Sequence, residues 1–179
     1  LQTKWEIFQN LNAVIGGRVD KDSRFATLPF NPRASLIYSP IENLNLKLIY
    51  GKAFVFPPPY FTYGVFQNPL QINQPNTNIS PEEAQSGELN VSYALGNLFL
   101  NIGTFYNTQS NLFLLAGGAP SPSIVKDEIW VKNSEKALKL TQNTNSGNSK
   151  MYGFDSLFKY KFNGSHNMFL ALSYVNGEY

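Results

Sequence analysis

The sequence predicts an all-β protein that forms part of an antiparallel transmembrane β-barrel. Three observations predict this class: segments of about ten residues alternate apolar and polar side chains, short polar turns join these segments in pairs, and much longer connections separate the pairs. A strand of about ten residues crosses a bilayer when it is tilted by roughly 45°. Short turns on one side and long loops on the other are typical of bacterial outer-membrane barrels.

The clearest pair comprises 31–39 and 44–54. One face of its first strand carries Pro32, Ala34, Leu36 and Tyr38, and the other carries Arg33, Ser35 and Ser39, with Ile37 as an exception. On its second strand one face carries Leu44, Leu46, Leu48 and Tyr50, and the other carries Asn45, Lys47 and Gly51, with Ile49 as an exception. This period of two predicts strands, because a helix would scatter the same residues over several faces.

The same pattern repeats along the chain. We expect strands at 1–5, 10–20, 31–40, 44–55, 86–95, 97–108, 150–162 and 167–179. Short turns are then expected at 6–10, 40–43, 96–97 and 163–166, and long loops at 21–30, 56–85 and 109–149. Weak strand signals at 127–132 and 137–141 indicate a small hairpin within the last loop, of undefined register. The turns and loops fall on opposite sides of the predicted sheet.

Composition excludes several classes of protein. Charged residues make up 15% of the 179 residues and the formal net charge is +2, which gives no electrostatic basis for binding nucleic acid. The absence of cysteine excludes a disulfide framework and thiolate metal sites. The chain begins and ends within expected strands. We therefore expect 1–179 to be a partial barrel domain within a longer polypeptide.

Several short motifs follow one another in a consistent order. They are Ile15-Gly-Gly-Arg-Val-Asp20, Asn31-Pro-Arg-Ala-Ser-Leu-Ile-Tyr38, Leu46-Lys-Leu-Ile-Tyr-Gly-Lys-Ala-Phe54 followed by Pro57, the segment 78–93 that begins Asn78-Ile-Ser-Pro-Glu-Glu, and Tyr152-Gly-Phe-Asp155. In this order the chain resembles the C-terminal part of the β-barrel of TonB-dependent outer-membrane receptors. Each motif is short, and it is their collinearity over nearly the whole chain that carries the resemblance.

The resemblance implies a fragment of about eight strands from a barrel of about 22 strands, with periplasmic turns and extracellular loops. It implies that the complete protein binds and imports a scarce nutrient across the bacterial outer membrane: a ferric siderophore, haem, cobalamin or a glycan. The implied partners are outer-membrane lipid, the remainder of the barrel and its plug domain, the TonB system acting through an N-terminal part, and the small-molecule nutrient. No nucleic acid partner is expected.

Three groups of residues are candidates for functional roles. Arg18, Asp20 and Arg33 lie near strand ends on the polar face, where we expect a lumen charge network, although strand-end charges without particular partners remain an alternative. The proline-rich segment after position 55 presents Phe56, Tyr60, Phe61 and Tyr63, which we expect to contact ligand or else to pack on neighbouring segments. Six tyrosines fall near strand ends on the apolar face, as an aromatic girdle requires: Tyr38, Tyr50, Tyr93, Tyr106, Tyr160 and Tyr174.

No pattern for catalysis, a metal or a cofactor is found. His166 is the only histidine, so neither a metal site with several ligands nor a Ser-His-Asp arrangement away from its turn can be built. We therefore expect no catalytic residue, no metal and no cofactor, and a protein that is not an enzyme. Two alternatives stay open: a soluble all-β ligand-binding module, such as a sandwich or lipocalin-like barrel, and a small complete outer-membrane barrel of eight strands.

Overall fold

The computed structural model describes residues 1–25, 28–67, 71–117, 139–164 and 166–179. Within them the chain forms ten strands and one short helix, in the order β1 (Gln2–Phe8), β2 (Leu11–Val19), β3 (Phe30–Ile41), β4 (Leu44–Val55), α1 (Pro59–Tyr63), β5 (Phe66–Gln67), β6 (Gln71–Gln74), β7 (Glu82–Leu95), β8 (Leu98–Gly117), β9 (Lys139–Lys161) and β10 (Asn167–Glu178). These elements fall into two compact units. Unit 1 comprises 1–54, 83–109 and 149–179, and unit 2 comprises 55–82 and 110–148.

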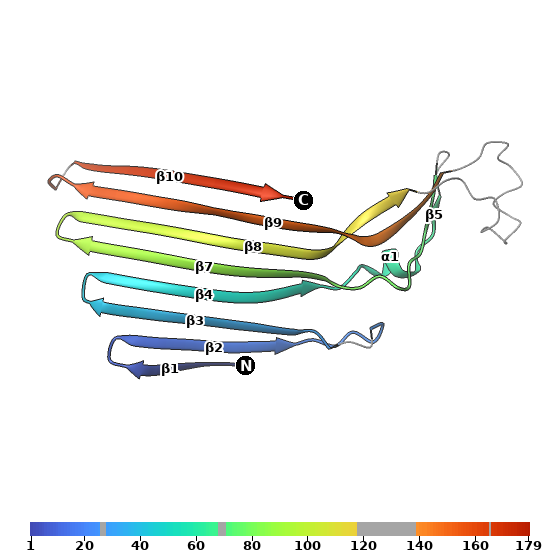
Figure 1. Ribbon diagram of the computed structural model, residues 1–179, viewed down its shortest axis with the longest axis horizontal. Coiled ribbons are helices and arrows are strands. Elements are labelled where there is room, and N and C mark those ends of the chain that lie inside the picture. The colour runs from blue at the N-terminus through green and yellow to red at the C-terminus, as the bar shows by residue number, and fades with distance from the viewer. Residues whose placement is uncertain (26–27, 68–70, 118–138, 165) are drawn as a thin grey trace, which may run out of the picture. The chain divides into compact units, whose positions relative to one another are not determined.

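Unit 1 is an antiparallel sheet whose strands lie side by side in the order β1, β2, β3, β4, β7, β8, β9 and β10 (Figure 1). The predicted eight crossings are therefore confirmed. The predicted pairing of 31–40 with 44–55 has the register Tyr38↔Leu46 and Ala34↔Tyr50. Strand β10 pairs with β9 without a register shift, from Asn167↔Lys161 to Glu178↔Lys150.

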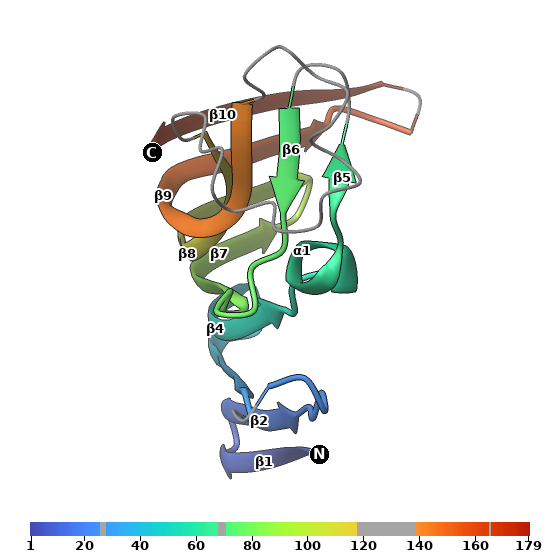
Figure 2. The ribbon, with the colours of Figure 1, turned by 90° about the vertical axis from the view of Figure 1, so that its right-hand side faces the viewer.

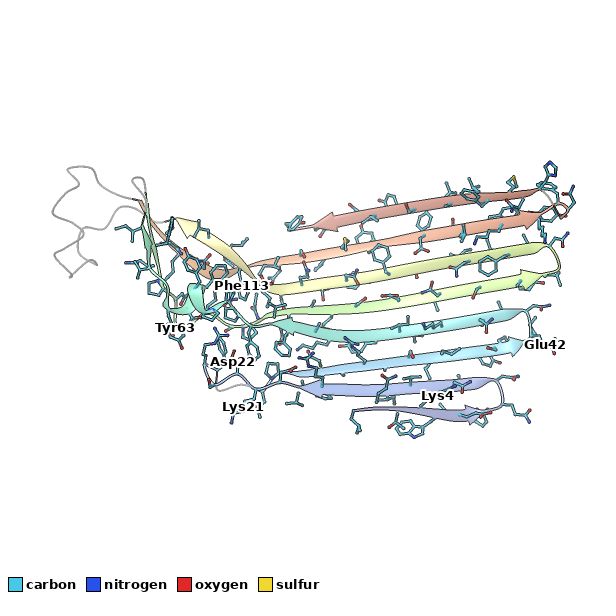
Figure 3. The ribbon with its side chains drawn as sticks, turned by 180° about the vertical axis from the view of Figure 1, so that it is seen from behind. Lys4, Lys21, Asp22, Glu42, Tyr63 and Phe113 are labelled. Atoms are coloured by element: carbon cyan, nitrogen blue, oxygen red, sulfur yellow. The ribbon has the colours of Figure 1, made fainter. Side chains whose placement is uncertain are left out.

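Short connections join the strands of unit 1 at one end of the sheet, where Figure 1 shows four hairpin turns and Figure 3 labels Glu42 in one of them. In the turn between β7 and β8, Gly96 has a φ of +56°. A type II′ turn requires positive φ at its first central residue, and glycine adopts it without steric cost. The turn after β1 is shorter than predicted, because the strand continues to Phe8 and leaves Gln9 and Asn10 as the turn.

The predicted loop at 109–149 is wrong at both ends. Strand β8 continues to Gly117 and β9 already begins at Lys139. The polar residues of these extensions are typical of loops in a sequence pattern, but β9 pairs with β8 and, over 139–142, with β6, and such ladders satisfy backbone groups. The weak strand signal at 137–141 partly coincides with the start of β9, whereas the signal at 127–132 lies outside the described residues.

Unit 2 contains secondary structure where the sequence predicted a loop over 56–85. Helix α1 begins at Pro59, a position that suits proline because the first helical N–H needs no partner, and ends before Gly64. Strands β5 and β6 form an antiparallel pair, and β6 also pairs with β9 in parallel, from Gln71↔Lys139 to Gln74↔Gln142 (Figure 2). Pro57, Ile72 and Ile79 are buried in this unit.

The two alternative folds disagree with unit 1. A soluble sandwich or lipocalin-like barrel needs an apolar core, yet Ala13 is the sole buried apolar residue among those described in unit 1. A complete eight-stranded barrel needs β1 to pair with β10, but among the described residues β1 pairs with β2 and β10 pairs with β9. No helix in the described ranges has the length and apolar character that crossing a membrane would require.

Candidate functional site

The two faces of the unit 1 sheet differ sharply in chemistry. One face borders an open hollow of about 920 Å³ to which all eight strands contribute. Polar side chains project from this face, among them Arg33 and Ser35 of β3, Glu88 of β7, Asn107 and Gln109 of β8, and Ser149 of β9. Gln109 accepts a hydrogen bond from Ser149 at 2.9 Å, and Ser86 donates one to Glu88 at 3.3 Å. We call this polar surface the lumen face.

Of the predicted charges, Arg18 and Arg33 project from the lumen face and Asp20 directly follows β2, and only Arg18 and Asp20 bond each other. Arg18 bonds Asp20 through Nε at 2.8 Å and through its terminal nitrogen at 2.7 Å. Arg33 lines the hollow opposite Gly16, and the described residues give it no ion pair. Because 77% of the Arg18 side chain is exposed, its pair with Asp20 contributes little stability by itself.

Sequence reasoning missed an amide and a carboxylate on the lumen face. A side chain added at Gly103 would meet Asn90 Oδ1 at 2.8 Å and Asp155 Oδ1 at 2.7 Å, so these two groups approach each other above a glycine. They come from β7 and β9, on either side of β8. The period of two could have assigned each to the polar face, but their meeting depends on strand register. Asn90 and Asp155, together above Gly103, form a second polar feature of the lumen face.

The four aromatic residues predicted to contact ligand separate into different environments in unit 2. Phe61 is half-buried and packs edge-on against Phe113, with ring centroids 5.7 Å apart. Tyr60 and Tyr63 lie one helical turn apart on α1 and are 46% and 58% exposed (Figure 3 labels Tyr63 and Phe113). Phe56 is partly exposed just before the buried Pro57. Of the four rings, Tyr60 and Tyr63 are thus the exposed ones.

Side-chain amides connect the segments of unit 2. Asn145 Nδ2 donates to the carbonyl of Ser80 at 2.9 Å, and Asn145 Oδ1 accepts from the N–H of Ser80 at 2.6 Å. Asn76 and Gln142 donate to backbone carbonyls of 143 and 75 respectively, both at 2.8 Å. Each of these bonds crosses more than 60 residues of sequence, and no local pattern identifies them. They hold 72–81 beside the first part of β9.

The other face of unit 1, which we call the outer face, is apolar and open. Exposed large apolar residues on this face come from all eight strands and include Trp5, Ile15, Leu36, Leu48, Leu89, Ile102, Phe154, Leu170 and Leu172. The six tyrosines proposed as a girdle project from it. Tyr38, Tyr93 and Tyr160 lie toward the short turns, and Tyr50, Tyr106 and Tyr174 lie toward the other end. An exposed apolar surface of this extent requires a covering phase or partner.

The described ranges contain no assembled metal site. His166 bonds Asn163 in the turn before β10, through its N–H at 2.9 Å and its ring Nδ1 at 3.1 Å. No group of three or more histidine, aspartate or glutamate side chains is arranged there to hold a metal.

The family model described as "TonB dependent receptor-like, beta-barrel" matches residues 1–179. The chain therefore belongs to the β-barrel domain family of TonB-dependent receptors. A search of curated proteins found no match.

Solved structures of this class share the fold at low sequence identity. The siderophore receptor PirA from Pseudomonas aeruginosa superposes with a TM-score of 0.77 at 15% identity, over 98% of this chain and 33% of that one. A mutant ferric enterobactin receptor PfeA from the same organism, in complex with enterobactin, gives 0.76 at 14% identity, over 97% of this chain and 26% of that one. The copper transporter OprC gives 0.62 at 13% identity, over 99% of this chain and 28% of that one. The chain thus spans about a quarter to a third of these structures.

Proposed function

We propose that this chain forms part of the barrel wall of a TonB-dependent receptor that binds a scarce nutrient at the bacterial outer membrane and imports it. The opposition of the two faces of unit 1 is the observation that carries the proposal. The lumen face borders the hollow and carries charged side chains such as Arg33, Glu88 and Asp155, whereas the outer face is largely apolar and exposed. A wall of this kind separates lipid from a polar interior.

The proposed roles follow from these faces. The outer face contacts lipid, whereas the lumen face, including Arg33 and the Arg18–Asp20 pair, faces a plug domain and the path of the nutrient. Unit 2 contributes Tyr60 and Tyr63 to nutrient binding, because exposed rings give contact area at small entropic cost. The energy for import comes from the TonB system through another part of the protein. The wall performs no chemistry of its own.

The class of nutrient is a ferric siderophore, haem, cobalamin, a glycan or a metal ion. Because a siderophore receptor and a copper transporter share this fold, a ferric siderophore and a metal ion are candidate nutrients. The test is deletion of the complete gene, followed by growth on single sources of each class: a ferric siderophore, haemin, cyanocobalamin, a maltooligosaccharide and a copper salt. Loss of growth on one source, reproduced by removal of TonB, supports the proposal. Unchanged growth and unchanged uptake of every source contradict it.

The contribution of unit 2 has a separate test in the full receptor. A variant with both Tyr60→Ala and Tyr63→Ala is expected to bind the nutrient identified above roughly tenfold or more weakly, since stacked rings contribute about 0.5–1.5 kcal/mol each. A matched variant with Tyr60→Phe and Tyr63→Phe keeps the rings and is expected to retain most of the affinity. Equal affinity of the alanine variant and the wild type would leave these tyrosines outside the binding site.

A further inference from the structure

The turn between β9 and β10 contains an asparagine followed by a glycine, a sequence in which the side chain can react with the backbone. Asn163 is exposed, and the glycine after it lies in open space, because a Cβ atom added at Gly164 would meet nothing within 4 Å. Among the described residues the Gly164 N–H has no hydrogen-bond partner. This backbone nitrogen is therefore accessible beside the Asn163 amide.

His166 directs two donors at the Asn163 amide oxygen. Its backbone N–H lies 2.9 Å from Asn163 Oδ1, and its ring Nδ1 lies 3.1 Å from the same atom. An amide oxygen only accepts hydrogen bonds, so Nδ1 carries the proton in this contact. Two donors on one carbonyl oxygen make its carbon more electrophilic and stabilise the negative charge that develops on the oxygen when a nucleophile attacks.

Backbone bonds hold His166 in this position. Its carbonyl oxygen accepts from the N–H of Phe162 at 3.0 Å and from that of Asn163 at 3.4 Å. Phe162 packs edge-on against Tyr160, with ring centroids 4.9 Å apart. The two donors are thus fixed to the end of β9, and donors that are already in place stabilise developing charge without a cost of reorientation.

A second asparagine followed by glycine, Asn176-Gly177 in β10, lacks this arrangement. There the Gly177 N–H itself donates to Asn176 Oδ1 at 3.0 Å, so the nitrogen that would attack is engaged with the oxygen and not directed at the carbon. The Asn176 amide nitrogen, which would have to leave, donates to the Tyr152 hydroxyl at 2.8 Å. Pairing with β9 also keeps both residues extended. The chain therefore contains its own comparison site.

We propose that Asn163 is a self-modification site, at which His166 promotes conversion of the asparagine to aspartate and isoaspartate. The Gly164 nitrogen forms a bond to Asn163 Cγ, and the two donors of His166 stabilise the oxyanion on Oδ1. The bond from Cγ to Nδ2 then breaks, the proton of the Gly164 N–H passes through water to Nδ2, and ammonia leaves a cyclic succinimide. Water adds to either carbonyl of this ring and opens it, which gives aspartate or isoaspartate.

This modification is independent of the proposed function. It takes place once in each chain and involves neither the nutrient nor the energy for import. The product carries a carboxylate where the turn had a neutral amide. In isoaspartate the main chain also passes through the side-chain methylene, so the turn between β9 and β10 becomes longer.

The test follows the purified full-length receptor in detergent over time, at neutral pH and physiological temperature. Digestion with pepsin at acidic pH limits further conversion, and peptide mass spectrometry with fragmentation then quantifies aspartate and isoaspartate at each site. In the folded wild type, Asn163 is expected to convert roughly tenfold or more faster than Asn176, because attack requires a correctly oriented nitrogen. An equal or lower rate at Asn163 overturns the proposal.

His166→Ala removes the ring donor and keeps the backbone donor. It is expected to slow conversion at Asn163 by roughly three- to tenfold, the rate equivalent of one exposed hydrogen bond. In urea, where the turn is lost, the same substitution is expected to have no effect. The matched control Asn167→Ala removes an exposed neighbouring side chain that makes no bond to Asn163 in the described structure, and it is expected to keep the wild-type rate. An unchanged or faster rate for folded His166→Ala contradicts the role of the ring.

Gly164→Ala tests the nucleophile. It places a methyl group beside the attacking nitrogen, where the structure has room for it, and is expected to lose most of the conversion at Asn163 without loss of the fold. Heat-modifiable mobility in gels checks that every variant folds. Conversion of Gly164→Ala at the wild-type rate would show that the backbone nitrogen does not attack, and would overturn the proposal.

Discussion

Asn145 donates its side-chain amide to the backbone carbonyl of Asn111 at 2.7 Å, and Asn111 has a φ of 59°. Asparagine tolerates this left-handed conformation better than most residues. The same side chain also bonds both backbone groups of Ser80. The Asn145 side chain therefore makes three hydrogen bonds to the backbone of other segments, and it joins three segments of unit 2.

Replacing Asn145 by alanine should loosen unit 2 without unfolding unit 1. Loss of its three bonds is expected to lower the free energy of local opening by about 1–3 kcal/mol. Hydrogen exchange in the full receptor should then speed up in 72–82 and stay unchanged in β2 and β3. Asn148→Ala, an exposed asparagine three residues further along β9, is the control. Equal exchange in the two variants would show that Asn145 does not hold these segments.

Gly153 has no room for a side chain. A Cβ atom there would collide with the backbone carbonyl oxygen of Tyr174 and would lie 2.8 Å from the Phe105 ring. Gly153→Ala should therefore destabilise the full receptor by about 1–3 kcal/mol, the usual range for overpacking. Urea unfolding in detergent measures the change.

Gly51→Ala provides the matched comparison for Gly153. It is also a strand glycine on the lumen face, and its nearest neighbour would be Arg33 Cγ at 4.0 Å, an ordinary contact. We expect its unfolding midpoint to stay close to that of the wild type. A destabilisation equal to that of Gly153→Ala would mean that backbone flexibility, and not space, governs both sites.

Substitutions on β10 should distinguish its two faces. Leu172 projects from the outer face, midway along the strand, and is 57% exposed. Leu172→Arg is expected to cost about 2–4 kcal/mol in liposomes, because an arginine near the bilayer midplane faces lipid. The adjacent Ser173→Arg projects from the lumen face opposite Asp155 and is expected to cost much less. Urea titration of both variants checks the difference, and a larger cost for Ser173→Arg would reverse the assignment of the faces.

The strands and the two faces of unit 1 could be predicted because their signal is local. Alternation at period two assigned Leu36 and Leu48 to one face and Arg33 and Lys47 to the other, and the register confirms both assignments. The first half of β9 was not predicted as a strand, because the polar composition of 141–149 is typical of a loop. Pairing between strands, not side-chain preference, keeps that segment extended.

The candidate site could be predicted less well because it depends on contacts distant in sequence. The aromatic segment was identified, but only the structure shows that Phe61 is half-buried against Phe113 while Tyr63 stays exposed. Likewise the bonds of Asn145 to Ser80 span 65 residues. The functional roles of Phe56, Tyr60 and the lumen charges stay predictions.

The connection after β2 contains a second local ion pair with a distinct dependence on pH. Arg24 bonds both carboxylate oxygens of Asp22, at 2.6 Å through its terminal nitrogen, and its backbone N–H donates to the same carboxylate at 2.9 Å. The side-chain bond from Arg24 is the main cause that lowers the pKa of Asp22 below its ordinary value of 3.8, and the backbone bond adds to it.

Because the pKa of Asp22 is lowered in the folded state, its stabilising contribution is present above pH 3.8 and is lost as the pH falls through the lowered value. Carbon-13 NMR of selectively labelled aspartate in the full receptor should show Asp22 titrating below 3.8. Arg24→Gln should return the pKa toward 3.8, whereas Lys21→Gln removes a neighbouring cation that makes no bond to Asp22 in the described structure and should leave the pKa lowered. If Lys21→Gln raised the pKa as much as Arg24→Gln, the general positive charge of the connection, rather than the bonds from Arg24, would be its cause.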